Sequence, residues 1–304
     1  MTEADQPETE LQTVRDWVRY AVSRFNAAEL IYGHGTANAL DEAAFLVLHT
    51  LKLPIDQLDP WLDAKLLMPE RIALRAIVEK RISTRKPAPY LTNEAWTGGH
   101  AFYVDERVIV PRSYLAELMA GGLDTAVPGL GKVERVLDLC TGSGCLAILA
   151  ALAFEDASVD AAELSPDALD VGERNVAAYG LEERVRLVRS DLFDGLEGQR
   201  YDLILSNPPY VSDASLAAFP PEYAAEPAMA HAGGGDGLDM VRRILEEAAA
   251  YLTDQGTLIV EIGMGRPTLE AEFSDLPFLW LDTDESESEV FALTRADLES
   301  AGSR

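Results

Sequence analysis

The sequence predicts an α/β protein in which a helical bundle and a linking β-hairpin precede a doubly wound, mostly parallel seven-stranded sheet. Two observations support this fold class. Apolar positions recur at helical spacing through the front part of the chain. From Val133 onward, short apolar runs alternate with helical segments, which is the pattern of parallel strands joined by crossover helices.

The 304 residues, 48% of them hydrophobic, suffice for one large or two ordinary domains. We expect a disordered, acidic tail at residues 1–10, a helical domain at residues 11–88, a hairpin and linker at residues 89–130, and the α/β domain at residues 131–304. The front domain contains no cofactor motif, so it has either a structural role or a role in gripping a substrate.

Three helices are predicted in the front domain. The first follows apolar positions from Leu11 to Phe25, which recur over about four turns. The second opens near Asp41 and is ended by Pro54. The third begins at Pro69 and runs to about residue 82, since proline is favoured in the first turn of a helix.

A proline-rich boundary at residues 86–89 separates the helical domain from the rest. Two β-rich runs follow, at residues 96–104 and 108–111, with Asp105-Glu106-Arg107 between them. These runs predict a hairpin that turns at residues 105–107. A short helix through Leu115 and Met119 then closes on glycines.

The α/β domain is expected to contain seven strands and the helices between them. The strands are predicted at residues 135–139, 158–162, 185–189, 203–206, 256–262, 279–281 and 290–293. The helices begin near Gly144, Pro166, Asp236 and Pro267. Residues 211–235 show no clear pattern and predict a long loop, and a long loop inside a compact domain is usually functional.

Several classes of function are disfavoured by composition. No run of eighteen apolar residues exists, so no membrane span is expected. The polar, acidic first residues resemble neither a signal nor a transit peptide. The only cysteines, Cys140 and Cys145, and four scattered histidines lack metal-ligand spacing, so we expect no metal site and a reducing, cytoplasmic location.

The chain is strongly acidic, with 25 Lys and Arg against 52 Asp and Glu and a net charge of −27. Such a surface repels a phosphate backbone, so tight nucleic-acid binding is not expected. A basic macromolecular partner is one interpretation of the acidity. General solubility, or adaptation to a salty cytoplasm, is an equally good one.

The strongest functional signal is Asn207-Pro208-Pro209-Tyr210, which directly follows a buried strand. The two prolines prevent continuation as strand or helix, so a rigid loop forms at the carboxyl end of the strand, where open α/β folds bind ligands. The Asn207 side-chain carbonyl and the Pro208 backbone carbonyl could accept the two hydrogens of one –NH2 group. An ordinary Pro-Pro turn is the alternative.

Acidic residues also follow the first three predicted strands. Asp138 precedes a tight turn whose glycines, Gly142 and Gly144, let the backbone approach a ligand, and its carboxylate suits an ammonium group. Glu163 follows the second strand and suits ribose hydroxyls. Asp191 follows the third and could accept from an adenine amino group, with Leu192 packed on the ring. Each residue alone is more often a solvated loop acid, and the prediction rests on their order along the chain.

This order of acids followed by Asn-Pro-Pro-Tyr resembles the class I S-adenosylmethionine-dependent methyltransferases, which have a Rossmann-like fold. The chain is similar to the protein-glutamine N-methyltransferases among them, in the branch that modifies large-subunit ribosomal protein uL3. The motifs of that branch are Tyr32-Gly33-His34-Gly35-Thr36, Tyr90-Leu91-Thr92-Asn93, Phe102-Tyr103-Val104-Asp105-Glu106-Arg107, Pro111-Arg112-Ser113, residues 140–145, Glu222-Tyr223 and Glu226-Pro227.

The resemblance implies methylation of a glutamine side-chain amide nitrogen on uL3, a basic protein partner, with S-adenosylmethionine converted to S-adenosylhomocysteine. It makes residues 131–304 the catalytic domain and residues 11–88 the substrate-recognition domain. The implied cofactor-binding residues are Asp138, Cys140, Thr141, Gly142, Ser143, Gly144, Glu163, Asp191, Leu192 and Asn207. The implied catalytic and substrate-binding residues are Asn207, Pro208, Pro209 and Tyr210, although Tyr210 could serve only in packing.

Three departures from the family pattern bear on these expectations. Cys140 fills the place of the first glycine in the usual loop, so a small side chain must tolerate that backbone. Glu163 stands where aspartate is common, and Ala224-Ala225 replaces a pair expected to be more polar. Glutamine methylation of release factors and adenine methylation of nucleic acid remain as alternatives, as does a non-catalytic protein that keeps the cofactor fold.

Overall fold

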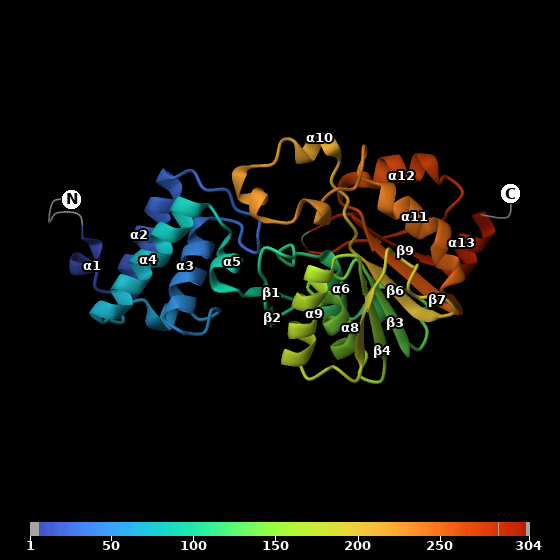
Figure 1. Ribbon diagram of the computed structural model, residues 1–304, viewed down its shortest axis with the longest axis horizontal. Coiled ribbons are helices and arrows are strands. Elements are labelled where there is room, and N and C mark those ends of the chain that lie inside the picture. The colour runs from blue at the N-terminus through green and yellow to red at the C-terminus, as the bar shows by residue number, and fades with distance from the viewer. Residues whose placement is uncertain (1–5, 285, 302–304) are drawn as a thin grey trace. The chain divides into compact units, whose positions relative to one another are not determined.

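A computed structural model describes residues 6–284 and 286–301, which form two compact units (Figure 1). The first unit comprises Met1–Glu94 and Pro220–Ala225, and the second comprises Ala95–Phe219 and Glu226–Arg304. The short segment Pro220–Ala225 therefore belongs to the helical unit, although the chain on both sides of it belongs to the second unit.

The first unit is helical, as the spacing of its apolar residues predicts. Of the expected disordered tail at residues 1–10, the first five lie outside the described residues, and Pro7–Glu10 forms a short helix. The helices are α1 (Pro7–Glu10), α2 (Val14–Ala27), α3 (Ala39–Thr50), η2 (Asp59–Trp61), α4 (Met68–Thr84), α5 (Ala88–Thr92) and η3 (Pro221–Ala225).

Local sequence explains where the three long helices begin. Thr13 and Asp16 form a reciprocal capping box at the start of α2, and the Asn38 side chain accepts from two backbone amides at the start of α3. Pro69 lies in the first turn of α4. The apolar faces of these helices meet in one core, which confirms the three predicted helices.

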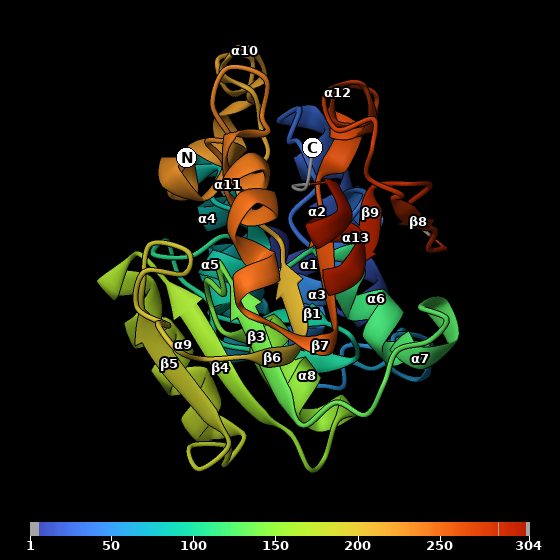
Figure 2. The same ribbon diagram turned by 90° about the vertical axis from the view of Figure 1, so that its right-hand side faces the viewer.

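The second unit contains a seven-stranded sheet in the order β5-β4-β3-β6-β7-β9-β8, in which only β9 runs antiparallel to its neighbours (Figure 2). The fold class and all seven strands are thereby confirmed. The strands are β3 (Arg135–Leu139), β4 (Ser158–Glu163), β5 (Val185–Arg189), β6 (Tyr201–Ser206), β7 (Leu252–Glu261), β8 (Leu279–Leu281) and β9 (Val290–Thr294).

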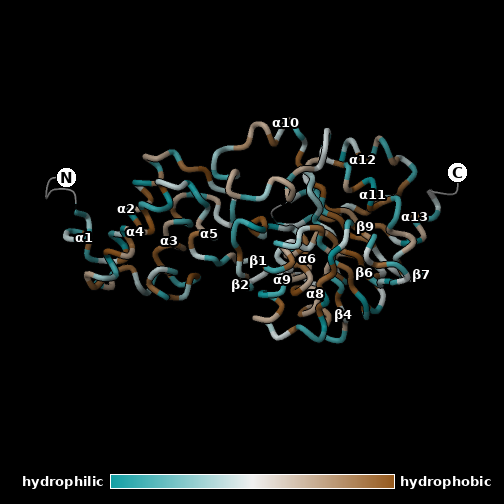
Figure 3. Tube along the Cα trace, viewed as in Figure 1, coloured by the Kyte–Doolittle hydropathy of each residue, from teal (hydrophilic) through white to brown (hydrophobic). Residues whose placement is uncertain are grey.

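Helices cover both faces of this sheet. One apolar cluster joins the sheet to α6, α7, α8 and α9, and a second joins its other face to α11, α12 and α13. Brown, hydrophobic stretches accordingly follow the strands in Figure 3. The helices are α6 (Tyr114–Ala120), α7 (Leu123–Ala126), α8 (Cys145–Ala153), α9 (Pro166–Ala178), α10 (Asp213–Leu216), η4 (Ala228–Ala230), α11 (Asp239–Glu247), η5 (Ala248–Ala250), η6 (Gly263–Gly265), α12 (Arg266–Glu272) and α13 (Arg295–Ala301).

The predicted position of the hairpin is wrong. The hairpin pairs β1 (Ala95–Thr97) with β2 (His100–Phe102) and turns at Gly98 and Gly99, which both have positive φ. Asp105-Glu106-Arg107 instead forms a separate turn, in which Val108 N donates to the Asp105 carbonyl, and the run at residues 108–111 pairs with no strand. The expected long loop is partly structured, since it contains α10, η3 and η4.

Among the described helices, none has the length and apolar character needed to cross a membrane.

Candidate functional site

Two adjoining cavities lie at the carboxyl ends of the parallel strands of the second unit. The larger has a volume of about 320 Å³ and the smaller about 160 Å³. Ile109, Asn207 and Ala230 line both cavities. The cavities lie at the point where the strand order reverses, between β3 and β6, which is where open α/β folds bind ligands.

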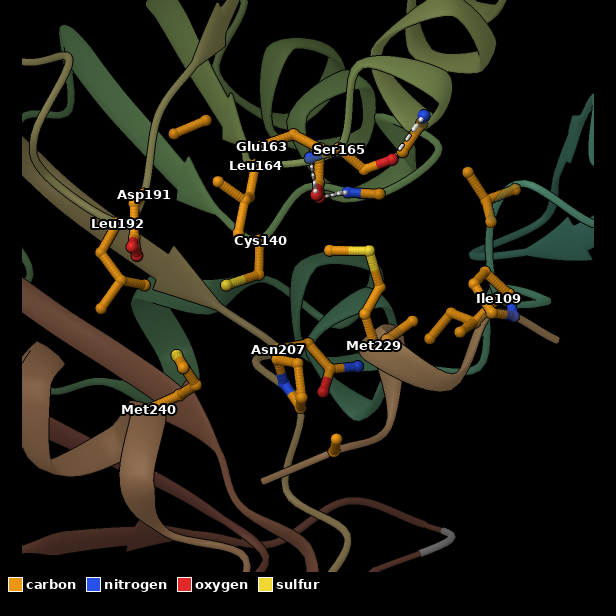
Figure 4. Close-up of a pocket in the computed structure, with 18 of the residues that line it drawn as sticks. Ile109, Cys140, Glu163, Leu164, Ser165, Asp191, Leu192, Asn207, Met229 and Met240 are labelled. Carbon is orange, nitrogen blue, oxygen red and sulfur yellow. Dashed lines mark hydrogen bonds between the residues drawn. The ribbon is translucent and has the colours of Figure 1, made fainter. Parts of the chain in front are cut away.

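The sheet places Cys140 and Asn207 next to each other at this edge. Leu139, the last residue of β3, pairs with Ser206, the last residue of β6, so the following residues leave the sheet side by side. The Ser206 hydroxyl donates to the Leu139 carbonyl at 3.1 Å and reinforces this pairing. Figure 4 shows Cys140 and Asn207 facing the larger cavity.

The loop after β3 has the backbone that the sequence predicts. Cys140, Gly142 and Gly144 have φ values of 59°, 56° and 77°, all in the left-handed region. Cys140 therefore adopts the conformation for which a glycine is usual, as the departure from the family pattern requires. Cys140 and Gly142 line the larger cavity, and Gly144 caps α8.

Asp138 lies beneath this loop and does not line either cavity. It is fully buried, and its Oδ2 accepts from the Thr141 hydroxyl at 2.5 Å. Its Oδ1 has no hydrogen-bond partner within the described residues. Burial raises the pKa of Asp138 to about 7, although the hydrogen bond from Thr141 opposes this rise. Thr141 and Ser143 are buried in the same loop, away from the cavity walls.

Glu163 ends β4 and lines the larger cavity (Figure 4). Its Oε2 accepts from Gly142 N at 3.0 Å and its Oε1 accepts from Ser165 N at 2.9 Å. A carboxylate has about four acceptor positions, so both oxygens keep capacity for donors from a ligand. Glu163 thus fixes the glycine loop and can also accept from a diol, despite replacing the more common aspartate.

Asp191 and Leu192 form the wall of the larger cavity beyond β5. Arg243 Nη1 lies 2.9 Å from Asp191 Oδ1 and orients the carboxylate. Leu192 has a positive φ of 48° and is buried, so its side chain provides an apolar surface. The structure therefore brings Cys140, Gly142, Glu163, Asp191, Leu192 and Asn207 to one cavity, while Asp138, Thr141, Ser143 and Gly144 do not line it.

The Asn207–Tyr210 loop lies where the two cavities meet. Pro209 lines the larger cavity, whereas Pro208 and Tyr210 line the smaller one. Within the part of the chain that the structure describes, neither the Asn207 carboxamide nor the Pro208 carbonyl takes part in a hydrogen bond. Two acceptors are therefore available at the boundary between the cavities.

Tyr210 is held by a group that the sequence analysis does not single out. Its hydroxyl donates to Oε1 of Glu261 at 3.0 Å. Glu261 is fully buried at the end of β7, and burial raises its pKa to about 7. Burial of Tyr210 raises the pKa of its hydroxyl, and the Glu261 carboxylate raises it further. The position of Glu261 at the end of a predicted strand is the sequence feature from which a role at the site could have been predicted.

The smaller cavity has a charged wall, to which the sequence motifs assigned no role. Arg112 lines it, and its guanidinium binds the buried Glu226 carboxylate through two contacts of 2.7 and 2.9 Å. Glu226 also accepts from Val110 N at 2.9 Å, and His231 Nε2 lies 2.9 Å from its Oε2. Arg112 and Glu226 both fall within motifs of the resembled branch, but His231 carried no sequence signal.

The two cysteine thiols have no features of a nucleophile. Burial raises the pKa of Cys140 well above its usual range and that of Cys145 to about 12. Both thiols therefore stay protonated at neutral pH. Within the described residues, no three His, Cys, Asp or Glu side chains are grouped so as to hold a metal ion.

The residues of the larger cavity fit an adenosyl cofactor with a charged amino-acid tail. Glu163 and Asp191 offer carboxylate oxygens, Leu192 an apolar face, and the glycine loop an accessible backbone. The orphaned Oδ1 of Asp138 beneath the loop suits an additional donor, directly or through water. Met229 and Met240, which the sequence analysis missed, complete the apolar lining (Figure 4).

Comparison with known proteins agrees with this geometry. The family model of the methyltransferase small domain matches residues 116–219. The ribosomal protein uL3 glutamine methyltransferase of Bordetella pertussis is 56% identical over 289 residues, which cover 95% of this chain and 97% of that protein. The proteins of the same name from Burkholderia pseudomallei and Neisseria meningitidis serogroup B are each 54% identical, over 95% and 97% of this chain and 97% of both relatives.

Proposed function

The chain belongs to the family of the ribosomal protein uL3 glutamine methyltransferases, and from this premise we propose that it methylates a glutamine side-chain amide of uL3. The methyl donor in this proposal is S-adenosylmethionine. The observation that carries the proposal is the position of Asn207, whose carboxamide makes no hydrogen bond within the described chain and lines both cavities. A group that bridges a cofactor cavity and a substrate cavity is placed to align two reactants.

The larger cavity would hold the cofactor. We propose that Glu163 accepts from the ribose hydroxyls, and that Asp191 accepts from the adenine amino group while Leu192 packs on the ring. Cys140, Gly142 and the rest of residues 140–144 would line the methionine part, with Asp138 acting from beneath the loop. When bound, S-adenosylmethionine supplies an electrophilic methyl group on a sulfonium centre.

The smaller cavity would hold the glutamine side chain. An amide nitrogen is a weak nucleophile because its lone pair is delocalised into the carbonyl. The Asn207 side-chain oxygen and the Pro208 carbonyl would each accept one N–H of the amide. These two acceptors orient the nitrogen and stabilise the positive charge that develops on it. Pro209 and Tyr210 keep the loop rigid.

A ribosomal substrate implies that the reaction takes place in the cytoplasm.

The proposal is tested with Asn207→Ala and with uL3 as the methyl acceptor. We expect this variant to lose methyl transfer, by about 10²-fold or more, because one of two positioning acceptors is gone. Cofactor affinity measured by calorimetry should change little, since Asn207 is one of many residues lining the larger cavity. Asn26→Ala, at an exposed asparagine of α2, serves as the matched control.

Mass spectrometry of the acceptor completes the test. A mass increase of one methyl group on a uL3 glutamine supports the proposal. Modification of a release factor alone would mean that the enzyme catalyses the same reaction on a different protein substrate. Retained turnover in Asn207→Ala would exclude the two-acceptor mechanism. Methylation of adenine in DNA or RNA is not favoured by a chain with a net charge of −27.

A further inference from the structure

The carboxylate of Glu261 joins two walls of the smaller cavity, although Glu261 itself lines neither cavity. Its Oε1 accepts from the Tyr210 hydroxyl at 3.0 Å. Its Oε2 accepts from the Ser113 hydroxyl at 2.6 Å and from Tyr114 N at 2.9 Å. One buried group thus binds the Asn207–Tyr210 loop on one side and the start of α6 on the other.

Both of these segments carry residues of the substrate cavity. Tyr210 lines the smaller cavity directly, and Arg112, which lines the same cavity, immediately precedes Ser113. The two segments lie far apart in the sequence, and Glu261 comes from a third element, β7. Because Glu261 is fully buried, its three hydrogen bonds are shielded from competition by water and fix the two segments firmly.

The surroundings of Tyr210 confine it further. Gly263 has a φ of 53°, and a Cβ added there would lie 2.9 Å from Cε2 of the tyrosine ring. Gly237 has a φ of 89°, and a Cβ added there would overlap the Tyr210 carbonyl oxygen. Tyr210 is therefore held at its hydroxyl, its ring and its backbone, which is more than a surface loop residue needs for packing alone.

We propose that Glu261 is a positioning residue for methyl transfer, which acts through Tyr210 and the start of α6 to fix the two walls that receive the acceptor amide. This inference rests on the proposed function. Glu261 touches no reacting atom, and its effect reaches the amide only through the placement of Tyr210 and Arg112. The raised pKa of Glu261 agrees with a carboxyl group kept out of water for a structural purpose.

The test uses Glu261→Gln, Tyr210→Phe and the double variant in the full-length protein. A glutamine has one oxygen and cannot accept from all three donors, so the cavity walls should loosen. We expect each single variant to lower kcat by roughly tenfold to a hundredfold, with calorimetric cofactor affinity unchanged. The double variant should be no worse than Glu261→Gln alone, because the connection that Tyr210→Phe removes is one of those that Glu261→Gln already disturbs. Glu270→Gln, at an exposed carboxylate of α12, is the control.

A second readout does not depend on turnover. In NMR spectra of protein with labelled tyrosines, the signal missing from Tyr210→Phe identifies Tyr210. That signal should shift in Glu261→Gln and stay unchanged in Glu270→Gln. An unchanged Tyr210 signal in Glu261→Gln would overturn the positioning role, even if uL3 proves not to be the substrate. The absence of wild-type turnover would instead count against the proposed function.

Two further results would overturn the inference. One is full kcat in Tyr210→Phe, which remains informative even if Glu261→Gln fails to fold. The other is additivity of the two single effects in the double variant, which would mean that Glu261 and Tyr210 act separately.

Discussion

At the residue scale, Asp138 combines full burial with a single side-chain hydrogen bond from Thr141. Its pKa is raised to about 7, because burial penalises the charged carboxylate more than the hydroxyl stabilises it. In the unfolded chain the same group has its ordinary pKa near 3.8. Between these two values the folded protein retains a proton that the unfolded chain has released.

This difference gives a pH dependence of stability with a definite sign. A raised folded-state pKa contributes stability that is fully present below the unfolded pKa and is lost as pH rises through about 7. We therefore expect the free energy of unfolding of the ligand-free protein to fall between about pH 4 and about pH 7, and this fall to be smaller in Asp138→Asn. Urea unfolding of the wild-type protein and of Asp138→Asn at each pH measures the free energy of unfolding and its change with pH.

The exposed Asp156 provides the matched control, since Asp156→Asn is the same substitution at a carboxylate that is not buried. Glu261, with a pKa also raised to about 7, contributes a fall of the same sign that remains in Asp138→Asn. Equal slopes for Asp138→Asn and Asp156→Asn would show that Asp138 does not carry the dependence.

Individual residues also show which features of the site could be predicted from the sequence. Cys140 was expected to occupy a glycine-like backbone position, and its φ of 59° confirms this. The prediction was possible because Cys140 fills the place of the first glycine in the usual loop of the resembled family. Glu261 was not assigned a role, because its partner Tyr210 lies 51 positions earlier in the sequence. Only the folded chain brings such groups together.

At the element scale, the hairpin shows how an apolar pattern can mislead. The run at residues 108–111 is buried at Val108 and Val110, as a strand would be, but it packs without pairing to a neighbour. The real turn uses Gly98 and Gly99, which reach positive φ without a steric penalty. Burial and strand pairing produce the same apolar spacing, so the sequence could not separate them.

The segment Pro220–Ala225 is an element whose position the sequence could not predict. The buried Glu222 accepts from Ile31 N at 3.1 Å, and Arg85 Nη2 lies 2.5 Å from the same oxygen. The Tyr223 ring packs against the His34 ring, with centroids 4.3 Å apart and the ring planes tilted by 54°. The segment is thus built into the helical unit by contacts with residues more than a hundred positions earlier.

We expect Glu222→Ala to release this segment from the helical unit. Losing a buried carboxylate that accepts from an amide and a guanidinium should cost about 1–3 kcal/mol of stability. Hydrogen exchange should become faster at residues 220–225 and at the Ile31 amide. Glu79→Gln, which weakens the half-exposed pair with Arg24, should cost at most about 0.5 kcal/mol. Unchanged exchange at residues 220–225 would show that the Glu222 carboxylate does not hold the segment.

At the scale of the whole molecule, the alternation of strands and helices was sufficient to predict the sheet. Most residues of the parallel strands β3, β4, β6 and β7 are buried, so these strands contain short apolar runs that can be recognised in the sequence. The sheet order, by contrast, follows from pairings such as Val136 with Leu203, which connect distant runs. The division of the chain into two units was visible only in outline, because residues 220–225 belong to the first unit.

The net charge of −27 is the property of the whole molecule that bears most directly on substrate encounter. A basic protein substrate approaching this surface is attracted over distances comparable to the Debye length, which is about 10 Å at 0.1 M salt. Such attraction accelerates association but does not change the chemistry within the smaller cavity. We therefore expect kcat/KM for uL3 to fall severalfold between about 0.05 and 0.3 M NaCl, while kcat stays constant.

A short, uncharged peptide containing the acceptor glutamine is the control for this prediction. Its kcat/KM should be insensitive to salt, because it carries no charge for the acidic surface to attract. Equal salt dependence for the peptide and for uL3 would indicate that salt acts on the enzyme itself. If neither rate depends on salt, the acidity serves solubility rather than substrate encounter, which is the alternative that the composition alone left open.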